Sequence, residues 1–192
     1  MIISHKHKFI FIKCPKTAGT SIQATLAECC GPDDIISSIG NIEGFLPQNH
    51  GFPDCNAHTT PTNIRKLVGE KIWDSYFKIV CVRNPFDIMV SWWHWHLKPG
   101  DFSEFIEKTS SLFNDFWLSE PIDYFIRFEY LNKDYKTLCE LLNLSYKVLP
   151  HHINFRKATN HYSTYYDDET RELIRNKYKC MINKFDYDFS KC

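Results

Sequence analysis

Two short and almost continuous apolar runs constrain the fold of this chain more than any other feature. The first is KFIFIK at residues 8–13, and the second is FKIVCV at residues 77–82. Such runs are typical of strands in parallel sheets, because helices cover both faces of those sheets. Signals for a helix follow both runs. The sequence therefore predicts an α/β protein with a mainly parallel central sheet, flanked by helices and joined by right-handed crossovers.

The other elements are predicted from helical periodicity, capping residues and a third apolar run. Thr60-Pro61 and Asn84-Pro85 each place a capping residue before a proline that suits the first helical position. Residues 31–57 show little periodicity and are expected to form a long loop, of the kind that tends to be functional in a compact domain. The expected helices cover residues 19–29, 61–69, 85–97, 101–109, 132–142 and 167–181, and the third strand covers residues 123–128.

Length, charge and aromatic content limit the classes of function. The 192 residues suffice for one compact domain and are few for two, so residues 1–192 are expected to form a single domain. With 23 basic and 23 acidic residues, the chain lacks a basic field for nucleic acid, and any anion site is local. Aromatic residues make up 16% of the chain, so some rings are expected to line a cleft. For Trp92, Trp93 and Trp95, core packing is favoured over stacking on adenine or a sugar.

The spacing of the cysteines and histidines favours neither disulfides nor a metal site. The eight cysteines are scattered, and several fall in apolar periodic segments, so reduced thiols and a cytoplasmic location are expected. No signal peptide and no membrane span are expected, since no apolar stretch approaches about 20 residues. His50, Cys55 and His58 lie close in the sequence without the paired spacing of zinc ligands, so no metal is expected.

The segment between the first strand and the following helix has the composition of an anion-binding loop. It reads CPKTAGTS at residues 14–21. The first turn of a helix offers unpaired backbone N–H groups and the positive end of the peptide dipoles. Gly19 would let the backbone approach an anion closely, Lys16 would add a positive charge, and Thr20 and Ser21 would add hydroxyl donors. The alternative is a simple junction of strand and helix with an incidental lysine.

This loop differs from an ordinary ATP or GTP loop. A Walker loop has its lysine directly after the second glycine, followed by a hydroxyl that binds magnesium. Here Lys16 precedes Gly19 by three residues, and Cys14-Pro15 replaces the first glycine. By itself the loop predicts only that an anion binds.

A second basic residue stands at the end of the other apolar run. Arg83 follows the strand at residues 77–82, at the edge where open α/β sheets bind ligands. A guanidinium group pairs with phosphate in a bidentate manner, and Ser91 lies about two turns into the next helix, so the two could hold one phosphate. A nucleoside triphosphatase would need an acidic residue there to organise magnesium. A structural salt bridge is the alternative for Arg83 alone.

The pair FIFIKCPKTAGTSI and KIVCVRNPFDIMVSWW resembles the two nucleotide motifs of the sulfotransferase superfamily, and most closely those of its carbohydrate-type, bacterial and Golgi branch. Residues 126–129 and 154–169 are also similar to that branch, so the likeness runs from about residue 8 to residue 189. The resemblance implies a P-loop-like fold and the donor 3′-phosphoadenosine 5′-phosphosulfate (PAPS). It implies that the 5′-phosphosulfate binds Lys16, Thr17, Ala18, Gly19, Thr20 and Ser21, and that Arg83 and Ser91 bind the 3′-phosphate. Lys157 is expected to be a further donor-binding residue.

The resemblance also implies the reaction, which is transfer of a sulfuryl group from PAPS to a hydroxyl of an acceptor, expected to be a carbohydrate. Sulfuryl transfer is similar to in-line phosphoryl transfer, and Lys16 would stabilise the departing phosphate. His58 stands where related carbohydrate sulfotransferases carry their catalytic histidine, so it is the candidate base. A cap for the helix at Pro61 is the alternative role of His58, and His50 and Glu43 are the reserve candidates for the base.

Two other functions fit parts of this pattern. A small P-loop kinase using ATP would share the strand, loop and helix, although the Walker lysine position and the acidic residue are missing. A non-catalytic module that binds a nucleotide would share the loop and Arg83 but would not need His58. Residues 31–57 and 98–122 match no motif and are expected to determine the acceptor. The oligomeric state is not predicted.

Overall fold

The computed structural model describes residues 1–38, 47–49, 58–96, 100–109, 115–150 and 160–190. The chain divides into two compact units, which are considered one at a time. The first unit comprises Met1–Val82 and Ser119–Ile153, and the second comprises Arg83–Leu118 and Asn154–Cys192.

The first unit is built on a five-stranded sheet in the order β3-β1-β2-β4-β5. Strands β2, β4 and β5 are parallel, as the apolar runs predict, and the α/β class is confirmed. Strand β1 pairs antiparallel with both β2 and β3, so the prediction of a mainly parallel sheet is only half right. The strands are β1 (Ile2–Ser4), β2 (Phe9–Ile12), β3 (Ile35–Ile36), β4 (Phe77–Val82) and β5 (Tyr124–Arg127).

The antiparallel edge arises from a hairpin at the start of the chain. Residues 5–8 form a turn that returns the chain, so that Ile2 lies opposite Phe11 and Ser4 lies opposite Phe9. Two strands joined by so short a loop can only be antiparallel. Strand β3 falls inside the region expected to be a long loop, where Ile36 also forms a bridge with Gln48.

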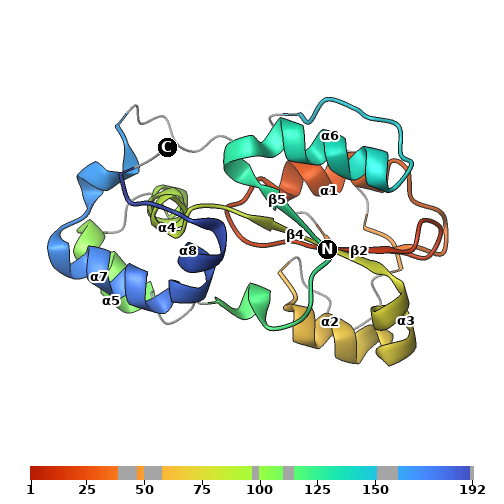
Figure 1. Cartoon of the computed structure of the whole chain (residues 1–192), viewed down its shortest axis with the longest axis horizontal. Helices are drawn as coiled ribbons and strands as arrows, with labels where there is room; N and C mark the ends of the chain where they lie inside the picture. Colours follow the sequence, from red (N-terminus) through yellow and green to blue (C-terminus); the bar gives the residue numbers. More distant parts are fainter. Residues whose placement is uncertain (39–46, 50–57, 97–99, 110–114, 151–159, 191–192) are drawn as a thin grey trace. The chain divides into compact units, whose positions relative to one another are not determined.

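Helices cover both faces of this sheet, which explains why its strands are mostly apolar. In Figure 1, α1 and α6 lie over one face, and α2 and α3 lie under the other. Alternate residues of a strand point to opposite faces. Phe9 and Phe11 pack in one cluster with Ile22 of α1 and Leu138 of α6, and Ile10 is equally buried. The helices are α1 (Gly19–Ala27), α2 (Pro61–Val68), α3 (Glu70–Ser75) and α6 (Leu131–Leu141).

The second unit is helical and follows directly from β4. Asn84 caps its first helix, because its side-chain oxygen accepts a hydrogen bond from the N–H of Phe86 at 3.1 Å. The amide group of Asn84 also donates to the hydroxyl of Tyr162 and the carbonyl of Asp188. Helix α4 packs against α5 and α7. The helices are α4 (Pro85–Trp95), α5 (Phe102–Thr109), α7 (Asp168–Lys177) and α8 (Lys179–Phe185), with short 3-10 turns at Asp115–Leu118 and Tyr162–Tyr165.

The last helix was expected to be continuous from about residue 167 to residue 181, and this prediction is wrong. The chain forms two helices, α7 and α8, which meet at Tyr178, where φ is −108° and ψ is 26°. Ile174, Tyr178 and Met181 are nevertheless all buried, as their spacing predicts. The apolar residues therefore keep their helical spacing across the break, so the sequence pattern does not indicate where the first helix ends.

Candidate active site

The loop between β2 and α1 has an unusual backbone. Lys16 and Ala18 have φ angles of 60° and 62°, in the left-handed region that residues other than glycine seldom adopt. Each such residue costs on the order of 1–3 kcal/mol and is typical of functional sites. The hydroxyl of Thr17 donates to the carbonyl of Cys14 at 3.0 Å, and the thiol of Cys81 in β4 donates to the carbonyl of Thr17 at 2.7 Å. These bonds hold the loop against the end of the sheet, and they turn the side chain of Thr17 inward.

The loop leads into the start of α1, which is suited to an anion. Ala18 is the N-cap and has no side chain to satisfy the first N–H groups, and among the described residues no acidic side chain lies in the first turn. The N–H groups of a first turn have no partner within the helix and carry the positive end of its dipole. Thr20 and Ser21 stand in this turn and are half-buried, as is Lys16. The structure therefore gathers Lys16, Gly19, Thr20 and Ser21 around one helix end.

Lys13 belongs to the same loop, although the sequence analysis did not assign it to the site. Only 4% of Lys13 is exposed, and burial alone lowers the pKa of its ammonium group from 10.5 to about 8. A Cβ atom added to Gly19 would lie 2.7 Å from Cγ of Lys13, so the glycine makes room for this side chain. The available signal was a charged residue at the end of a buried strand, because lysine is almost never fully buried without a partner.

His58 lies directly against this loop. Its Nδ1 atom is 2.9 Å from the carbonyl oxygen of Lys13. A carbonyl can only accept, so Nδ1 carries the proton and Nε2 carries the lone pair. The pKa of His58 falls from 6.5 to about 4, first because its ring is removed from water and then because Lys13 and Lys16 are positively charged. The residue as a whole is exposed, so its side chain also reaches solvent.

The structure also decides the alternative role of His58 as a helix cap. Thr60 is the N-cap of α2, and its hydroxyl accepts a hydrogen bond from the N–H of Asn63. The capping alternative for His58 is therefore wrong, and the sequence signal Thr60-Pro61 is confirmed.

Arg83 and Ser91 belong to the second unit. Arg83 is 8% exposed, and its Nε and Nη2 atoms lie 2.8 Å and 2.6 Å from Oδ2 of Asp87. The structural salt bridge considered for Arg83 thus exists. Asp87 and Ser91 are four residues apart on α4 and share one face of it, and Ser91 is half-buried. Asp87 therefore fixes the direction of the guanidinium group at the start of the helix that carries Ser91.

Comparison with known proteins identifies the family. The model of the sulfotransferase family matches residues 1–111, which include the loop, His58, Arg83 and Ser91. The chain belongs to the sulfotransferase family. Among solved structures, this sulfotransferase is similar to mouse sulfotransferase SULT7A1 complexed with PAP, with a TM-score of 0.55 over 91% of this chain and 84% of the other. At 16% sequence identity this likeness concerns the fold. No curated protein sequence matches the chain significantly.

Some predicted residues of this sulfotransferase lie outside the described residues, namely Lys157 and the reserve bases His50 and Glu43. Within the described ranges, no group of three or more His, Cys, Asp and Glu side chains could hold a metal ion. In the same ranges, no helix has the length and apolar character needed to cross a membrane. The cysteines described there form no disulfide with one another, namely Cys14, Cys29, Cys30, Cys81, Cys139 and Cys180.

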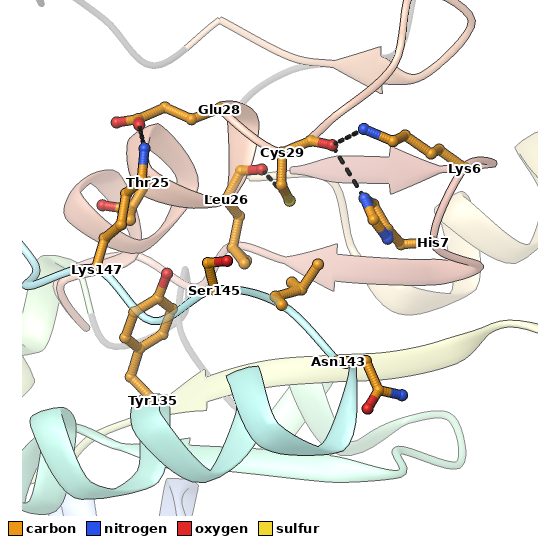
Figure 2. A pocket seen from close by; sticks show the side chains of 11 residues that line it. Lys6, His7, Thr25, Leu26, Glu28, Cys29, Tyr135, Asn143, Ser145 and Lys147 are labelled. Carbon is orange, nitrogen blue, oxygen red and sulfur yellow. Dashed lines mark hydrogen bonds and ion pairs between the residues drawn. The ribbon is translucent and has the colours of Figure 1, made fainter.

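A pocket of about 320 Å³ lies at the other end of α1 and is distinct from this loop. Figure 2 shows Lys6 and His7 pointing toward the carbonyl of Cys29, at 2.7 Å and 3.0 Å, and Lys147 paired with Glu28. Lys6 and His7 thus satisfy a carbonyl at the carboxyl end of the helix, which is the negative end of its dipole. The cations of the pocket already have partners, so the pocket is not a counterpart of the anion site at the N-terminus.

Proposed function

We propose that this sulfotransferase takes PAPS as its donor and transfers the sulfuryl group to a hydroxyl of a carbohydrate. One observation carries the proposal. The loop at the N-terminus of α1 carries Lys16 and accepts a hydrogen bond from Nδ1 of His58, which supports an anion site with a base beside it. The similar mouse enzyme is complexed with PAP, which as 3′-phosphoadenosine 5′-phosphate would be the product left by PAPS.

The proposed donor contacts follow the family motifs. Lys16, Gly19, Thr20 and Ser21 would bind the 5′-phosphosulfate through the ammonium group, the backbone N–H groups and the hydroxyls. Thr17 and Ala18 would act through the backbone, because the hydroxyl of Thr17 donates to Cys14. In the second unit, Arg83 and Ser91 would bind the 3′-phosphate, with Asp87 holding the guanidinium group, and Lys157 would add a further contact. In this proposal the two units are parts of one sulfotransferase-like domain.

The proposed reaction is a single in-line displacement. The acceptor oxygen forms a bond to sulfur while the bond between sulfur and the bridging oxygen breaks, and the electron pair leaves with the 5′-phosphate. Lys16 and the N–H groups of α1 stabilise the charge on that phosphate. Nε2 of His58 takes the proton of the acceptor hydroxyl. Negative charge beside Lys13 and Lys16 would offset the repulsion that lowers the pKa of His58 and would make the ring a stronger base.

The proposal also specifies a carbohydrate as the acceptor and a cytoplasmic location. The acceptor rests on the likeness of both nucleotide motifs to the carbohydrate-type branch, and the location rests on the scattered cysteines. No metal is required, because a sulfuryl group carries less charge than a terminal phosphoryl group.

Ligand binding tests the donor. Without magnesium, 3′-phosphoadenosine 5′-phosphate is expected to raise the melting temperature strongly, while AMP and ATP raise it far less, because only the first ligand has a 3′-phosphate for Arg83 and Ser91. An equal shift with ATP would favour the kinase. Incubation with labelled PAPS and pooled glycans then tests the transfer. Binding of the nucleotide without any labelled glycan would favour the non-catalytic module.

A further inference from the structure

Two of the described lysines in the first unit are buried, and they differ in what surrounds their ammonium groups. Lys78 is 7% exposed, and its Nζ atom lies 2.9 Å from the carbonyl of Tyr76 and 2.8 Å from Asp123. Lys13 is 4% exposed, and within the described residues its ammonium group has no hydrogen bond and no ion pair. A buried charge is normally paired, because taking it out of water is costly. Among the described residues, no carboxylate therefore stands as a counter-charge to Lys13.

The side chain of Lys13 lies across the start of α1. Its Cγ and Cδ atoms are 2.7 Å and 3.6 Å from the position that a Cβ atom of Gly19 would occupy. Its positive charge also contributes more to the lowered pKa of His58 than the charge of Lys16 does. The stem of the Lys13 side chain therefore runs along the first turn of α1, and its charge is felt at the ring of the proposed base.

Building on the proposed donor, we propose that Lys13 is a second catalytic cation, whose ammonium group binds the 5′-phosphosulfate of PAPS together with Lys16. The anion supplies the missing counter-charge. As the bond between sulfur and the bridging oxygen breaks, negative charge grows on the leaving phosphate, and a cation on a largely buried side chain stabilises that charge more strongly than a fully exposed one. The half-buried Lys16 and the buried Lys13 then bind the group together.

This assignment predicts opposite effects on stability and on binding. Lys13→Met replaces a largely buried charge, which has no ion-pair partner among the described residues, by an apolar side chain of similar length, so the protein without ligand should melt at a higher temperature. The affinity for 3′-phosphoadenosine 5′-phosphate should fall on the order of 10- to 100-fold, as expected for the loss of a hydrogen bond to a charged group. The affinity for adenosine 3′-phosphate, which lacks the 5′ group, should not change.

Calorimetric titration of the wild type, Lys13→Met and Lys16→Met with both nucleotides, together with melting curves, tests the inference. Lys78→Met is the matched control, because it removes a buried lysine that has partners. It should melt at a lower temperature and bind 3′-phosphoadenosine 5′-phosphate as the wild type does. Lys13→Gln, which keeps a polar end, provides a second variant if Lys13→Met does not fold.

The outcomes separate this inference from the proposed function. If the wild type does not bind 3′-phosphoadenosine 5′-phosphate, the proposed donor is wrong and the role of Lys13 falls with it. If the wild type binds it and Lys13→Met or Lys13→Gln binds equally well, only the role of Lys13 is overturned. A lower melting temperature for Lys13→Met with unchanged affinity would show that the lysine is structural.

Discussion

His58 is oriented by the hydrogen bond from Nδ1 to the carbonyl of Lys13. Because that carbonyl is part of the loop backbone, the ring is positioned by the same segment that would hold the donor. The lowered pKa keeps the ring neutral at pH 7, so its lone pair is available without a prior loss of a proton. Removing the ring leaves the ammonium groups of the loop and the start of α1 in place. Proton transfer and donor binding can therefore be separated by mutation.

His58→Ala is expected to lower turnover at saturating donor by on the order of 10²–10⁴-fold, the usual effect of losing a general base. The dissociation constant for 3′-phosphoadenosine 5′-phosphate should remain nearly that of the wild type, because no proposed phosphate contact is lost. His50→Ala is the control, since it removes a histidine that precedes His58 by eight residues. An active His58→Ala, or an inactive His50→Ala, would contradict the assignment of the base.

At the scale of elements, the junction of β2 and α1 is the part of the fold that matters most for the site. The strand ends at Ile12, the helix begins at Gly19, and the loop between them folds back through two residues with positive φ. Gly19 itself does not have such a φ. Its lack of a side chain is needed for space, because Lys13 passes where a Cβ atom would stand.

Gly19→Ala is therefore expected to displace Lys13 or the loop and to weaken binding of 3′-phosphoadenosine 5′-phosphate about 10-fold or more, as loss of a charge-assisted contact would. Gly69→Ala is the control, because Gly69 has a φ of 78° with nothing within 4 Å of its added Cβ. That variant should cost on the order of 1–3 kcal/mol of stability, since Gly69 has φ 78° and ψ 161°, a backbone conformation that essentially only glycine adopts, and it should leave binding unchanged. Titration calorimetry and urea unfolding measure the two effects. Wild-type affinity in Gly19→Ala would show that the space is not needed.

Elements with strong local signals were predictable from the sequence. The parallel strands β2 and β4 follow from apolar runs, and the starts of α2 and α4 follow from Thr60-Pro61 and Asn84-Pro85. Strands β1 and β3 have three and two residues, too few to show a period of two. The break at Tyr178 is hidden because both helices bury the same apolar stripe.

The site was predictable only in part, for a similar reason. The loop and His58 each have a position in the family motifs, so each could be proposed from the sequence. The hydrogen bond that joins His58 to Lys13 spans 45 residues and depends on how the intervening chain folds. The burial of Lys13 likewise depends on Gly19 and the neighbouring strands. No local pattern reveals either feature.

At the scale of the whole molecule, several groups that titrate below neutral pH make the free energy of unfolding fall as the pH falls. Burial alone would raise the pKa of Asp34, but hydrogen bonds from the N–H groups of Gly31 and Lys6 outweigh it and lower the pKa. In Asp134, hydrogen bonds from Arg127 outweigh burial in the same way. Acids with a lowered pKa stabilise the fold above their ordinary pKa, and this contribution is lost as the pH falls. The lowered pKa of His58 likewise makes the fold less stable as the pH falls from 6.5 to about 4.

Groups that titrate above neutral pH have opposing effects on the free energy of unfolding. The pKa of Lys13 is lowered by burial from 10.5 to about 8, so between these values the unfolded chain binds more protons and stability rises with pH. Burial raises the pKa of Cys14, Tyr135 and Tyr166, whose ordinary values are 9.0, 10.0 and 10.0. Acids with a raised pKa lose stability as the pH rises above their ordinary values. The free energy of unfolding is therefore expected to be highest near pH 8–9.

The contribution of Lys13 to this curve can be isolated by comparison with Lys13→Met. Below pH 8 the charged lysine costs the wild type about 1.4 kcal/mol for each unit of its pKa shift, or roughly 3 kcal/mol in all. The variant should therefore be the more stable protein at pH 7, and its advantage should shrink by roughly 2–3 kcal/mol as the pH rises to 10. The thiols and phenols are the same in both proteins and cancel in the difference. Urea unfolding from pH 5 to 10, analysed as a two-state transition, measures this difference in the free energy of unfolding between the two proteins. A difference that stays constant across this range would show that the ammonium group of Lys13 keeps its ordinary pKa, and hence that it is not held without a counter-charge.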